Sequence, residues 1–465
     1  MTHNFASARS FVAPLRKLIR RAILGTMLLV LFASMAFGLQ SHPSLTETRK
    51  AAEQGDAKAQ YSLGLMYYEG DGVLKDLTQA VSWFRKAAEH GYADAQYNLA
   101  VMYAQGEGVS KDALQAFSWY RKAAEQGVAD AQYNLGKILS REGAAQNLTE
   151  AAAWYRKAAD QGHADAQTNL GMMYAGGNGL EQNSQQAVFW YRKAAEQGNA
   201  VGQTNLGMSY VTGDGVETDY AQAIALFLKA AEQKYPDAQY DLGVMNNKGV
   251  GMKRDAAQAA AWFRKAADQD YAPAQFNLGL LCKKGDGVPQ DLPLAASLFA
   301  KAAEQGNSYA QYNLGVLYEL GRGVPKDPVQ AASWYRKSGE QGYQIAQDSL
   351  GAMYAKGDEI PRDFPQAISW FRKAADQGYD DAQFNLGVAY LHGDGVPKDL
   401  SQAASWFRKA ADQGHDKAQN NLGYLYAKGS GVTQDLHEAA AWYQKAIAQG
   451  NTDAKYNLSL LQTDK

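Results

Sequence analysis

The dipeptide Ala-Gln recurs along this chain of 465 residues at an almost constant interval. It ends at Gln60, Gln96, Gln132, Gln167, Gln239, Gln275, Gln311, Gln347, Gln383 and Gln419, and Gly202-Gln203 and Ala454-Lys455 complete the series. Every interval is 36 residues except the one of 35 residues between Gln132 and Gln167. Such a period is typical of solenoids and other repeat arrays. The sequence therefore predicts eleven repeats, with half-repeats at 49–55 and after residue 455.

Each repeat contains two segments with helical periodicity. In the first repeat, apolar residues recur three or four positions apart within 59–67 and again within 80–88. This spacing is typical of amphipathic helices with one buried stripe, and neither segment shows the alternation of a strand. We predict an all-α fold, an αα-superhelix (solenoid) of about eleven helix-turn-helix repeats that occupies 41–465.

All nine tryptophans occupy one position of the second helix of a repeat. They are Trp83, Trp119, Trp154, Trp190, Trp262, Trp334, Trp370, Trp406 and Trp442. A large apolar residue that always falls at one helical phase indicates core packing, so we place these rings in the core. Glycines equivalent to Gly64 follow the buried leucine of the first helix, and we interpret them as points where two helix backbones approach closely.

The loop GDGVPKD at 393–399 resembles a phosphate or metal site when it is taken alone. It lacks the Gly-Lys-Ser/Thr ending of a P-loop, no strand precedes it, and it offers fewer oxygens than a calcium loop needs. Its glycines suit the end of one helix, and Asp399 followed by Gln402 has the spacing of a capping box for the next. We predict a structural turn that recurs in almost every repeat.

Two departures from the glycine pattern predict local strain or altered loops. Lys234 and Asp270 replace the glycine that ends the second helix elsewhere, so these corners should be slightly strained. The loop at 141–147 lacks the paired glycines, and the loop GDEIPRD at 357–363 loses the second glycine.

The first 40 residues have the composition of an export signal. Residues 1–21 carry five basic residues and no acid, and the run at 22–39 is apolar and uncharged. This pattern is typical of a secretory signal peptide, here cleavable after Ala36, or of a membrane anchor. Either alternative predicts an exported chain that is periplasmic, anchored in the inner membrane facing the periplasm, or secreted.

Composition excludes several other classes. The formal net charge is −2 and no basic patch dominates, which argues against a nucleic-acid partner. The single cysteine, Cys282, rules out an intramolecular disulfide, and we expect it to pack as a small apolar residue. The recurrent Arg-Lys…Glu pattern of the second helix predicts a solvated face, with a charge stripe for a partner as the alternative.

The repeat reads as AQxNLGxMYxxGxGVxxDxxQAxxWxxKAAEQG, and over 46–463 the chain closely resembles the Sel-1-like repeat family, relatives of tetratricopeptide repeats. The resemblance implies an antiparallel helical hairpin for each repeat, stacked into a right-handed superhelix. It also implies an adaptor or scaffold for protein complexes, often in the bacterial envelope or at the host interface.

In repeats of this kind the first helix lines the concave face, which suggests candidate binding residues. The residue after Ala-Gln is usually aromatic, and the next is usually asparagine, whose amide can both donate and accept hydrogen bonds. The candidates are Tyr61, Tyr97, Asn98, Tyr133, Asn134, Asn169, Asn205, Tyr240, Phe276, Asn277, Tyr312 and Asn313. Two interpretations remain open: a ladder that grips a peptide or a cell-wall glycan, or packing between neighbouring repeats.

Nothing in the sequence points to catalysis, a metal or a cofactor. The histidines fall at scattered helical phases without the spacing of metal ligands. Some cysteine-rich relatives are linked to β-lactam hydrolysis, but this chain has no Ser-x-x-Lys motif and no cysteine framework. We therefore predict a non-enzymatic protein-binding scaffold of the bacterial cell envelope, in contact with the membrane only through its N-terminal segment. A glycan or peptidoglycan binder is the alternative, and a hydrolase ranks third.

Overall fold

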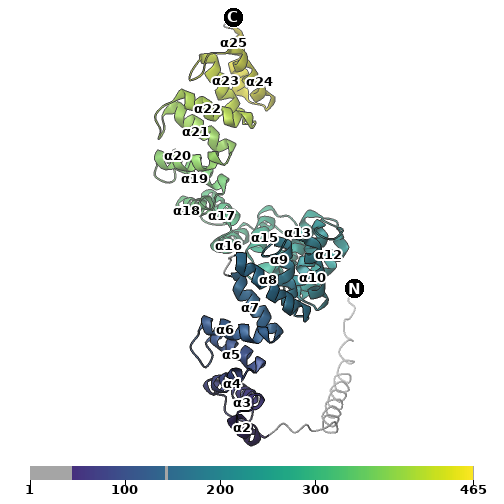
Figure 1. Cartoon of the computed structure of the whole chain (residues 1–465). Helices are drawn as coiled ribbons and strands as arrows, with labels where there is room; N and C mark the ends of the chain where they lie inside the picture. The colour runs from purple at the N-terminus through teal and green to yellow at the C-terminus, as the bar shows by residue number, and fades with distance from the viewer. Residues whose placement is uncertain (1–43, 142–144, 464–465) are drawn as a thin grey trace, which may run out of the picture. The chain divides into compact units, whose positions relative to one another are not determined.

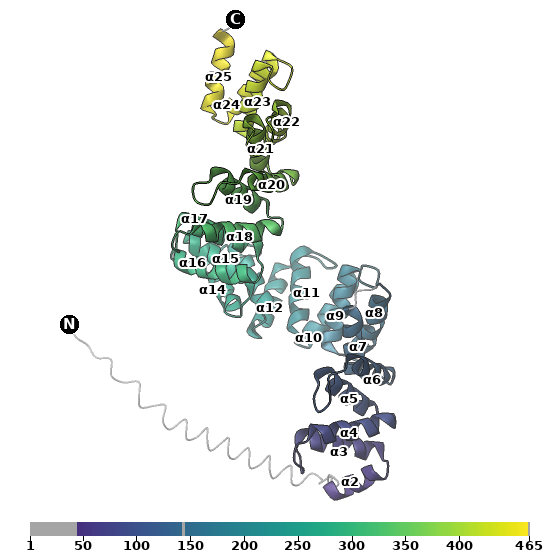
Figure 2. The same ribbon diagram turned by 90° about the vertical axis from the view of Figure 1, so that its left-hand side faces the viewer.

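A computed structural model describes residues 44–141 and 145–463, and within them it contains 24 helices and no strand. The predicted signal or anchor at 1–40 lies outside these residues. The helices fall into two compact units, one that ends at Gln182 and one that begins at Asn183. In each unit the helices stack in order along the chain (Figures 1 and 2). The expected all-α solenoid is confirmed.

The odd-numbered helices are the first helices of the repeats, and the even-numbered helices are the second helices. The first helices are α3 (Ala57–Glu69), α5 (Ala93–Gln105), α7 (Ala129–Arg141), α9 (Ala164–Gly176), α11 (Ala200–Thr212), α13 (Pro236–Lys248), α15 (Ala272–Lys284), α17 (Ser308–Leu320), α19 (Gln344–Lys356), α21 (Asp380–His392), α23 (Asp416–Lys428) and α25 (Thr452–Thr463). The second helices are α2 (Leu45–Glu53), α4 (Leu77–Glu89), α6 (Ala113–Glu125), α8 (Ala145–Asp160), α10 (Ser184–Glu196), α12 (Tyr220–Glu232), α14 (Ala256–Ala267), α16 (Leu292–Glu304), α18 (Pro328–Glu340), α20 (Phe364–Asp376), α22 (Leu400–Asp412) and α24 (Leu436–Ala448). Within each compact unit, every helix packs on its neighbours in the chain.

The glycine of the first helix accommodates an aromatic ring and also lets the two backbones approach, since a Cβ added to Gly423 would lie 3.1 Å from the carbonyl oxygen of Ala439. A Cβ atom added to Gly64 would lie 2.6 Å from Cδ1 of Phe84, and one added to Gly387 would lie 2.5 Å from Cδ1 of Phe407. Both rings are almost fully buried. The ring sits one residue after the tryptophan position, so the residue that contacts the glycine most closely is not the tryptophan.

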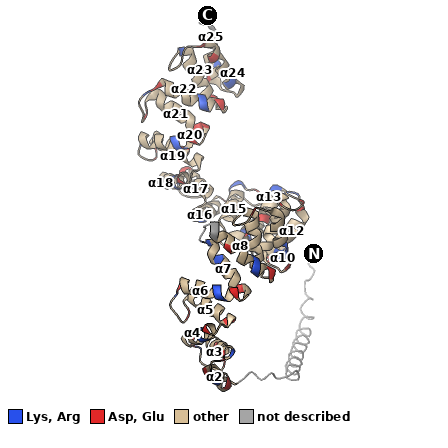
Figure 3. Ribbon diagram, viewed as in Figure 1, with Lys and Arg blue, Asp and Glu red and all other residues tan. Residues whose placement is uncertain are grey.

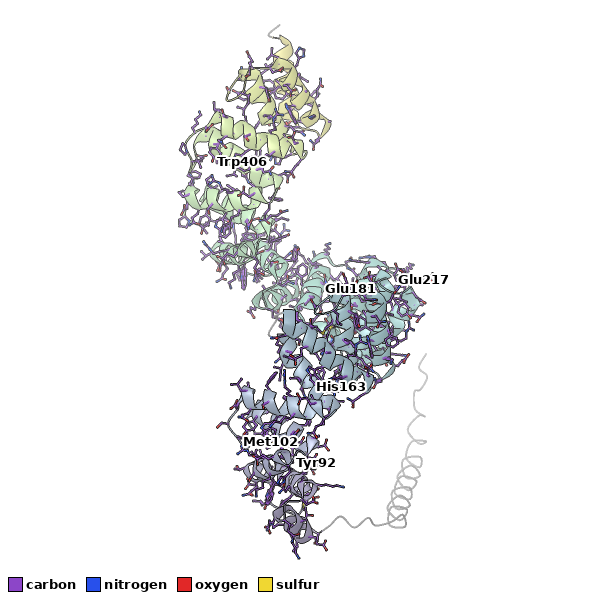
Figure 4. The ribbon with its side chains drawn as sticks, in the orientation of Figure 1. Tyr92, Met102, His163, Glu181, Glu217 and Trp406 are labelled. Atoms are coloured by element: carbon purple, nitrogen blue, oxygen red, sulfur yellow. The ribbon has the colours of Figure 1, made fainter. Side chains whose placement is uncertain are left out.

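The tryptophans are less uniformly buried than the sequence suggests. Trp154, Trp190, Trp370 and Trp442 are buried, whereas the other five are half-buried. A lysine one turn further along the helix covers the ring: Nζ of Lys409 lies 3.7 Å from the ring centroid of Trp406, which is labelled in Figure 4. The aliphatic stem and the charge of the lysine thus replace part of the apolar cover.

The glutamine of the recurrent Ala-Gln links neighbouring repeats by hydrogen bonds. Nε2 of the buried Gln311 donates to the carbonyl oxygen of Ala303 at 3.0 Å, and its Oε1 accepts from Nε2 of Gln341 at 2.7 Å. A buried amide is costly unless it is hydrogen-bonded. These bonds therefore give a physical reason why glutamine recurs at the same position of the repeats. Gln96, Gln239, Gln275 and Gln383 make equivalent pairs of bonds.

The recurrent loops are turns, as predicted, but the capping box does not close. Oδ1 of Asp399 accepts from the backbone N–H groups of Ser401 and Gln402 at 2.9 and 3.0 Å. The N–H of Asp399 itself donates to the carbonyl oxygen of Tyr390 at 2.9 Å, so it does not need the side chain of Gln402. Gly393 has φ 86° and Gly395 has φ 74°, which explains the paired glycines.

The departures from the loop pattern have visible consequences. Lys234 and Asp270 adopt φ of 64° and 59°, the left-handed conformation that their glycine equivalents adopt without a Cβ. Helix α8 begins at Ala145, so Asn147, at the position equivalent to the N-cap Asp399, lies inside the helix and does not cap it. Residues 142–144 of that loop lie outside the described part of the chain.

Arg85 and Arg192 of the second helices are exposed, as the charge pattern predicts, and each also donates a hydrogen bond to the next first helix. Arg85 donates from Nη2 to the hydroxyl of Tyr103 at 2.6 Å, across to the next first helix. Arg192 makes the same bond to Tyr210 at 3.0 Å.

Among the described helices, none is both long and apolar enough to cross a membrane.

Candidate partner-binding grooves

The candidate residues occupy two adjacent positions on the first helices, here named the ring position and the amide position. The ring position follows the glutamine of Ala-Gln, and the amide position follows the ring position. The ring of Tyr61 lies 5.7 Å from that of Phe84 in its own repeat and 4.9 Å from that of Tyr92 at the start of the next. Burial raises the pKa of the Tyr61 hydroxyl, with a smaller contribution from Asp94.

In several repeats the amide position connects a first helix to the one before it. Nδ2 of Asn98 donates to the hydroxyl of Tyr61 at 3.4 Å, and Nδ2 of Asn277 donates to that of Tyr240 at 3.2 Å. Asn313 differs, because its Oδ1 accepts from Nζ of Lys283 at 2.9 Å. The packing interpretation thus has direct support in these repeats.

All twelve candidates are half-buried and lie on first helices. Within the compact unit that ends at Gln182 these are Tyr61, Tyr97, Asn98, Tyr133, Asn134 and Asn169. Within the unit that begins at Asn183 they are Asn205, Tyr240, Phe276, Asn277, Tyr312 and Asn313. Their use by a partner stays a prediction, and of the twelve Asn98 lines one of the grooves described below.

A groove lies between α3 and α5, beside the amide position of the second repeat. Its volume is about 180 Å³, and Leu65, Tyr68 and Asn98 line it, with Phe84 of α4 as its floor. Met102 of α5, labelled in Figure 4, also contributes to the lining. Tyr68 donates from its hydroxyl to Oε2 of Glu107 at 3.3 Å, across the rim.

The same groove recurs between α19 and α21 in the other compact unit. It also has a volume of about 180 Å³, and Phe371 of α20 takes the place of Phe84. Ala352, Ala355 and Val388 line its sides, and Asn385 stands at the amide position. One groove type is therefore built into the repeat, with a lining that varies from repeat to repeat. We name this one the apolar groove.

A third groove of this type, between α17 and α19, is acidic. It has a volume of about 280 Å³, and Glu319, Asp348, Asp358 and Glu359 contribute carboxylates to its lining. Lys356 is the lining residue with a positive charge. Figure 3 shows that acidic and basic residues of the described helices are otherwise interspersed along each compact unit. We name this cavity the acidic groove.

The carboxylates of the acidic groove differ in how they are paired. Asp348 accepts from Nδ2 of the neutral Asn385 at 2.9 Å. Burial raises the pKa of Asp348 to about 6, with smaller opposing and reinforcing effects of Asn385 and of Asp381. Glu319 accepts from the hydroxyl of Tyr335 at 2.5 Å.

The departure at 357–363 supplies part of the acidic groove. Glu359 occupies the place of the missing second glycine, and its Oε1 lies 2.5 Å from Nζ of Lys326. The missing glycine already distinguished this loop in the sequence. Asp348 occupies a ring position, where most repeats carry an aromatic residue. Glu319 was not anticipated, because its position in the repeat carries residues as different as Tyr68 and Ala355.

The grooves present polar, charged and apolar side chains. In the described part of the chain, no three or more His, Cys, Asp or Glu side chains are placed to hold a metal ion. Half-buried rings, amides and carboxylates offer hydrogen bonds, apolar contact and charge to a partner.

The family model for the Sel1 repeat matches eleven consecutive stretches of the chain. They are 57–92, 93–128, 129–163, 164–199, 200–235, 236–271, 272–307, 308–343, 344–379, 380–415 and 416–451. A secretory immunoglobulin A-binding protein of Escherichia coli O6:H1, EsiB, is 42% identical over 65 residues. That match spans 14% of this chain and 13% of EsiB.

Two solved structures extend the similarity to most of the chain. One is a protective antigen of uropathogenic Escherichia coli strains that displays an SLR fold, with 41% identity, a TM-score of 0.70, and coverage of 90% of this chain and 91% of the antigen. The other is a Sel1 repeat protein from Oxalobacter formigenes, with 35% identity, a TM-score of 0.52, and coverage of 70% of this chain and 93% of that protein.

Proposed function

From the membership of this chain in the Sel1 repeat family, we propose that it is a non-enzymatic scaffold of the bacterial cell envelope. It binds other proteins in the grooves between its first helices. The recurrence of one groove type in both compact units carries the proposal. Within a compact unit, stacked repeats present such grooves side by side on one surface, and the side chains that differ from groove to groove supply selectivity.

The proposed location rests on the N-terminal composition and on two relatives. The basic and apolar segments at 1–40 have the order of an export signal or anchor. One relative is named as a binder of secretory immunoglobulin A and another as a protective antigen. These names favour an envelope or extracellular location for this chain as well, and they favour a protein ligand.

A glycan ligand is the second candidate, and the contacts of the ring position favour it less. Rings at this position already pack against a ring of the second helix, with centroid distances of 5.7 Å at Tyr61 and 6.0 Å at Tyr97. These contacts leave less ring face for a sugar.

Affinity capture from an envelope extract tests the proposal. The wild-type chain without 1–40 serves as bait, beside a variant with Tyr97, Asn98, Tyr133 and Asn134 replaced by alanine. We expect the variant to retain less of a protein partner while its helical circular dichroism is unchanged. A matched control replaces Ser118 and Glu125, which are exposed on α6, and should bind like the wild type.

Three results would count against the proposal. Retention of purified peptidoglycan instead of protein would favour the glycan candidate. A loss of helicity in the fourfold variant would assign those residues to packing. Equal retention by all three baits would remove the first-helix face from the binding surface.

A further inference from the structure

The acidic groove and the apolar groove are neighbours on the two sides of α19. Both are lined by Ala352 and Lys356, so one helix separates a cavity with four carboxylates from a cavity with an apolar lining. The floor of the apolar groove is Phe371, which is 5% exposed, and Ile368 and Val388 add to its walls. We name the two grooves together the α19 site.

The size of each groove suits one side chain. Their volumes are about 280 and 180 Å³, whereas pockets for drug-sized ligands occupy about 300–1,000 Å³. A larger ligand would therefore have to enter with two separate groups, one for each groove. A chain with side chains at a suitable spacing meets this requirement.

Charge selects the group that suits the acidic groove. Glu359 pairs with Lys326, Glu319 accepts from a tyrosine hydroxyl, and Asp348 accepts from a neutral amide. Lys326 and Lys356 offset two of the four carboxylates, so the groove keeps an excess of negative charge. A guanidinium or an ammonium group that enters would form charge-assisted hydrogen bonds, which are among the stronger ones.

The distance between the two grooves determines how far apart in the ligand's sequence the two entering side chains must be. Packed helices lie about 8–10 Å apart, so two grooves that flank one helix are separated by about that distance. A polyproline II segment rises about 3.1 Å per residue with three residues per turn, so residues i and i+3 lie about 9 Å apart on one side. In a β-strand, residues on one side are about 7 Å or about 13 Å apart, which fits less well.

We propose that the α19 site binds an extended segment of a protein partner that carries a basic residue and a large apolar residue three positions apart. The basic side chain enters the acidic groove, and the apolar side chain enters the apolar groove against Phe371. This inference rests on the proposed function and narrows it to one site and one class of ligand.

Peptide binding to the chain without 1–40 tests the spacing, with fluorescence anisotropy as the readout. The probes are labelled proline-rich peptides that contain Arg-Pro-Pro-Leu or Leu-Pro-Pro-Arg. The controls shorten the spacing to Arg-Pro-Leu or replace either anchor by alanine. We expect one order of the three-position spacing to bind, and each control to bind at least about tenfold more weakly.

Two variants test the two grooves separately. Asp348→Asn with Glu359→Gln removes two charges from the acidic groove. The Asp348→Asn change has a precedent in the chain, because Asn420 stands at the equivalent position and accepts from Asn457 at 2.9 Å. Ala355→Leu fills the apolar groove and also has a precedent, since Leu391 occupies that position in the next repeat.

We expect both variants to bind the peptide at least about tenfold more weakly than the wild type. Added salt should weaken peptide binding by the wild type more than peptide binding by the charge variant. Asp241→Asn is the matched control, since it removes a half-buried carboxylate of the same compact unit outside the α19 site, and it should change the affinity less than about twofold.

Several outcomes would overturn the inference. They are the absence of peptide binding, equal affinity for both spacings, binding that depends on the arginine alone, and binding that the groove variants leave unchanged. Different results would refute the proposed function. A captured protein partner that binds the α19 variants as well as the wild type would refute this site and leave the scaffold role intact.

Discussion

At the scale of single residues, two corners of the array show a backbone cost that the sequence predicts. Lys234 and Asp270 adopt left-handed conformations that cost an L-residue about 1–2 kcal/mol. Replacement of either by glycine should raise the free energy of unfolding by about 1 kcal/mol, because glycine adopts this conformation freely and loses only part of the gain to its larger unfolded entropy.

Chemical denaturation followed by circular dichroism measures this effect. Gly306→Lys is the reciprocal control, because Gly306 has φ 92° at the equivalent corner and should lose stability. An unchanged or lower midpoint for Lys234→Gly would show that the lysine makes compensating contacts.

A second residue-scale prediction concerns pH. Burial raises the pKa of Asp241 to about 7, and Asp237 adds to the rise. Since the folded pKa exceeds the unfolded value of about 3.9, the folded chain binds this proton more tightly, and the resulting stability is complete below about pH 4 and lost as the pH rises through about 7. Asp241→Asn should remove this dependence and stabilise the chain at pH 8 by about 1–3 kcal/mol.

Unfolding midpoints between pH 4 and pH 8 for wild type and variant provide the measurement. Parallel curves for the two proteins would mean that Asp241 does not titrate in this range. Asp348, whose pKa is raised to about 6, should also make both proteins less stable as the pH rises, by a smaller amount than Asp241 does in the wild type.

At the scale of helices, the pairing of a glycine with an aromatic ring determines how closely the two helices of a repeat pack. Gly387→Ala would place a Cβ about 2.5 Å from the ring of Phe407, which is fully buried and has little room to move. Overpacking of this kind costs about 1–3 kcal/mol, and the better helix propensity of alanine recovers up to about 1. We expect a net loss of about 1–2 kcal/mol.

A double-mutant cycle with Phe407→Leu isolates the contact. The cost of Gly387→Ala should shrink by more than about 0.5 kcal/mol when the ring is absent. Independent, additive effects would indicate that the glycine serves another purpose. The second repeat offers a natural comparison, since it carries Ala100 at this position.

The sequence predicted the helices well and their contacts less well, for a physical reason. Periodicity of apolar residues determines which face of a helix is buried, so the two helices of each repeat and their turns followed directly. Periodicity does not say which of two adjacent aromatic residues points inward, and so Trp83 was placed in the core where Phe84 lies deeper.

The candidate site, too, could be predicted from the sequence only in part. The ring and amide positions could be recognised from the repeat, and Asn98, Asp348 and Asn385, which occupy them, line grooves. The grooves themselves arise between helices that are 36 residues apart in sequence, as for Leu65 and Val101, and their depth depends on side chains from three helices. Of the acidic groove, the sequence predicted an altered loop at 357–363 but not the cluster of carboxylates.

At the scale of the whole molecule, each repeat contacts only its neighbours within a compact unit, so stability should be distributed along the chain in a quasi-one-dimensional way. The glutamine pairs are one of the links between repeats. Gln311→Ala removes a buried amide and leaves the carbonyl of Ala303 and the side chain of Gln341 without this partner, at a cost of about 1–3 kcal/mol.

Hydrogen exchange followed by mass spectrometry can show how far this loss extends. We expect faster exchange in α16, α17 and α18, which carry the broken hydrogen bonds, and a smaller effect in the adjoining helix pairs. Helices α22 to α24 should keep their protection, because no contact of Gln311 reaches them. Uniformly faster exchange over all helices of this compact unit would instead mean that it unfolds as one cooperative body, and a binding event at the α19 site would then stabilise distant repeats as much as near ones.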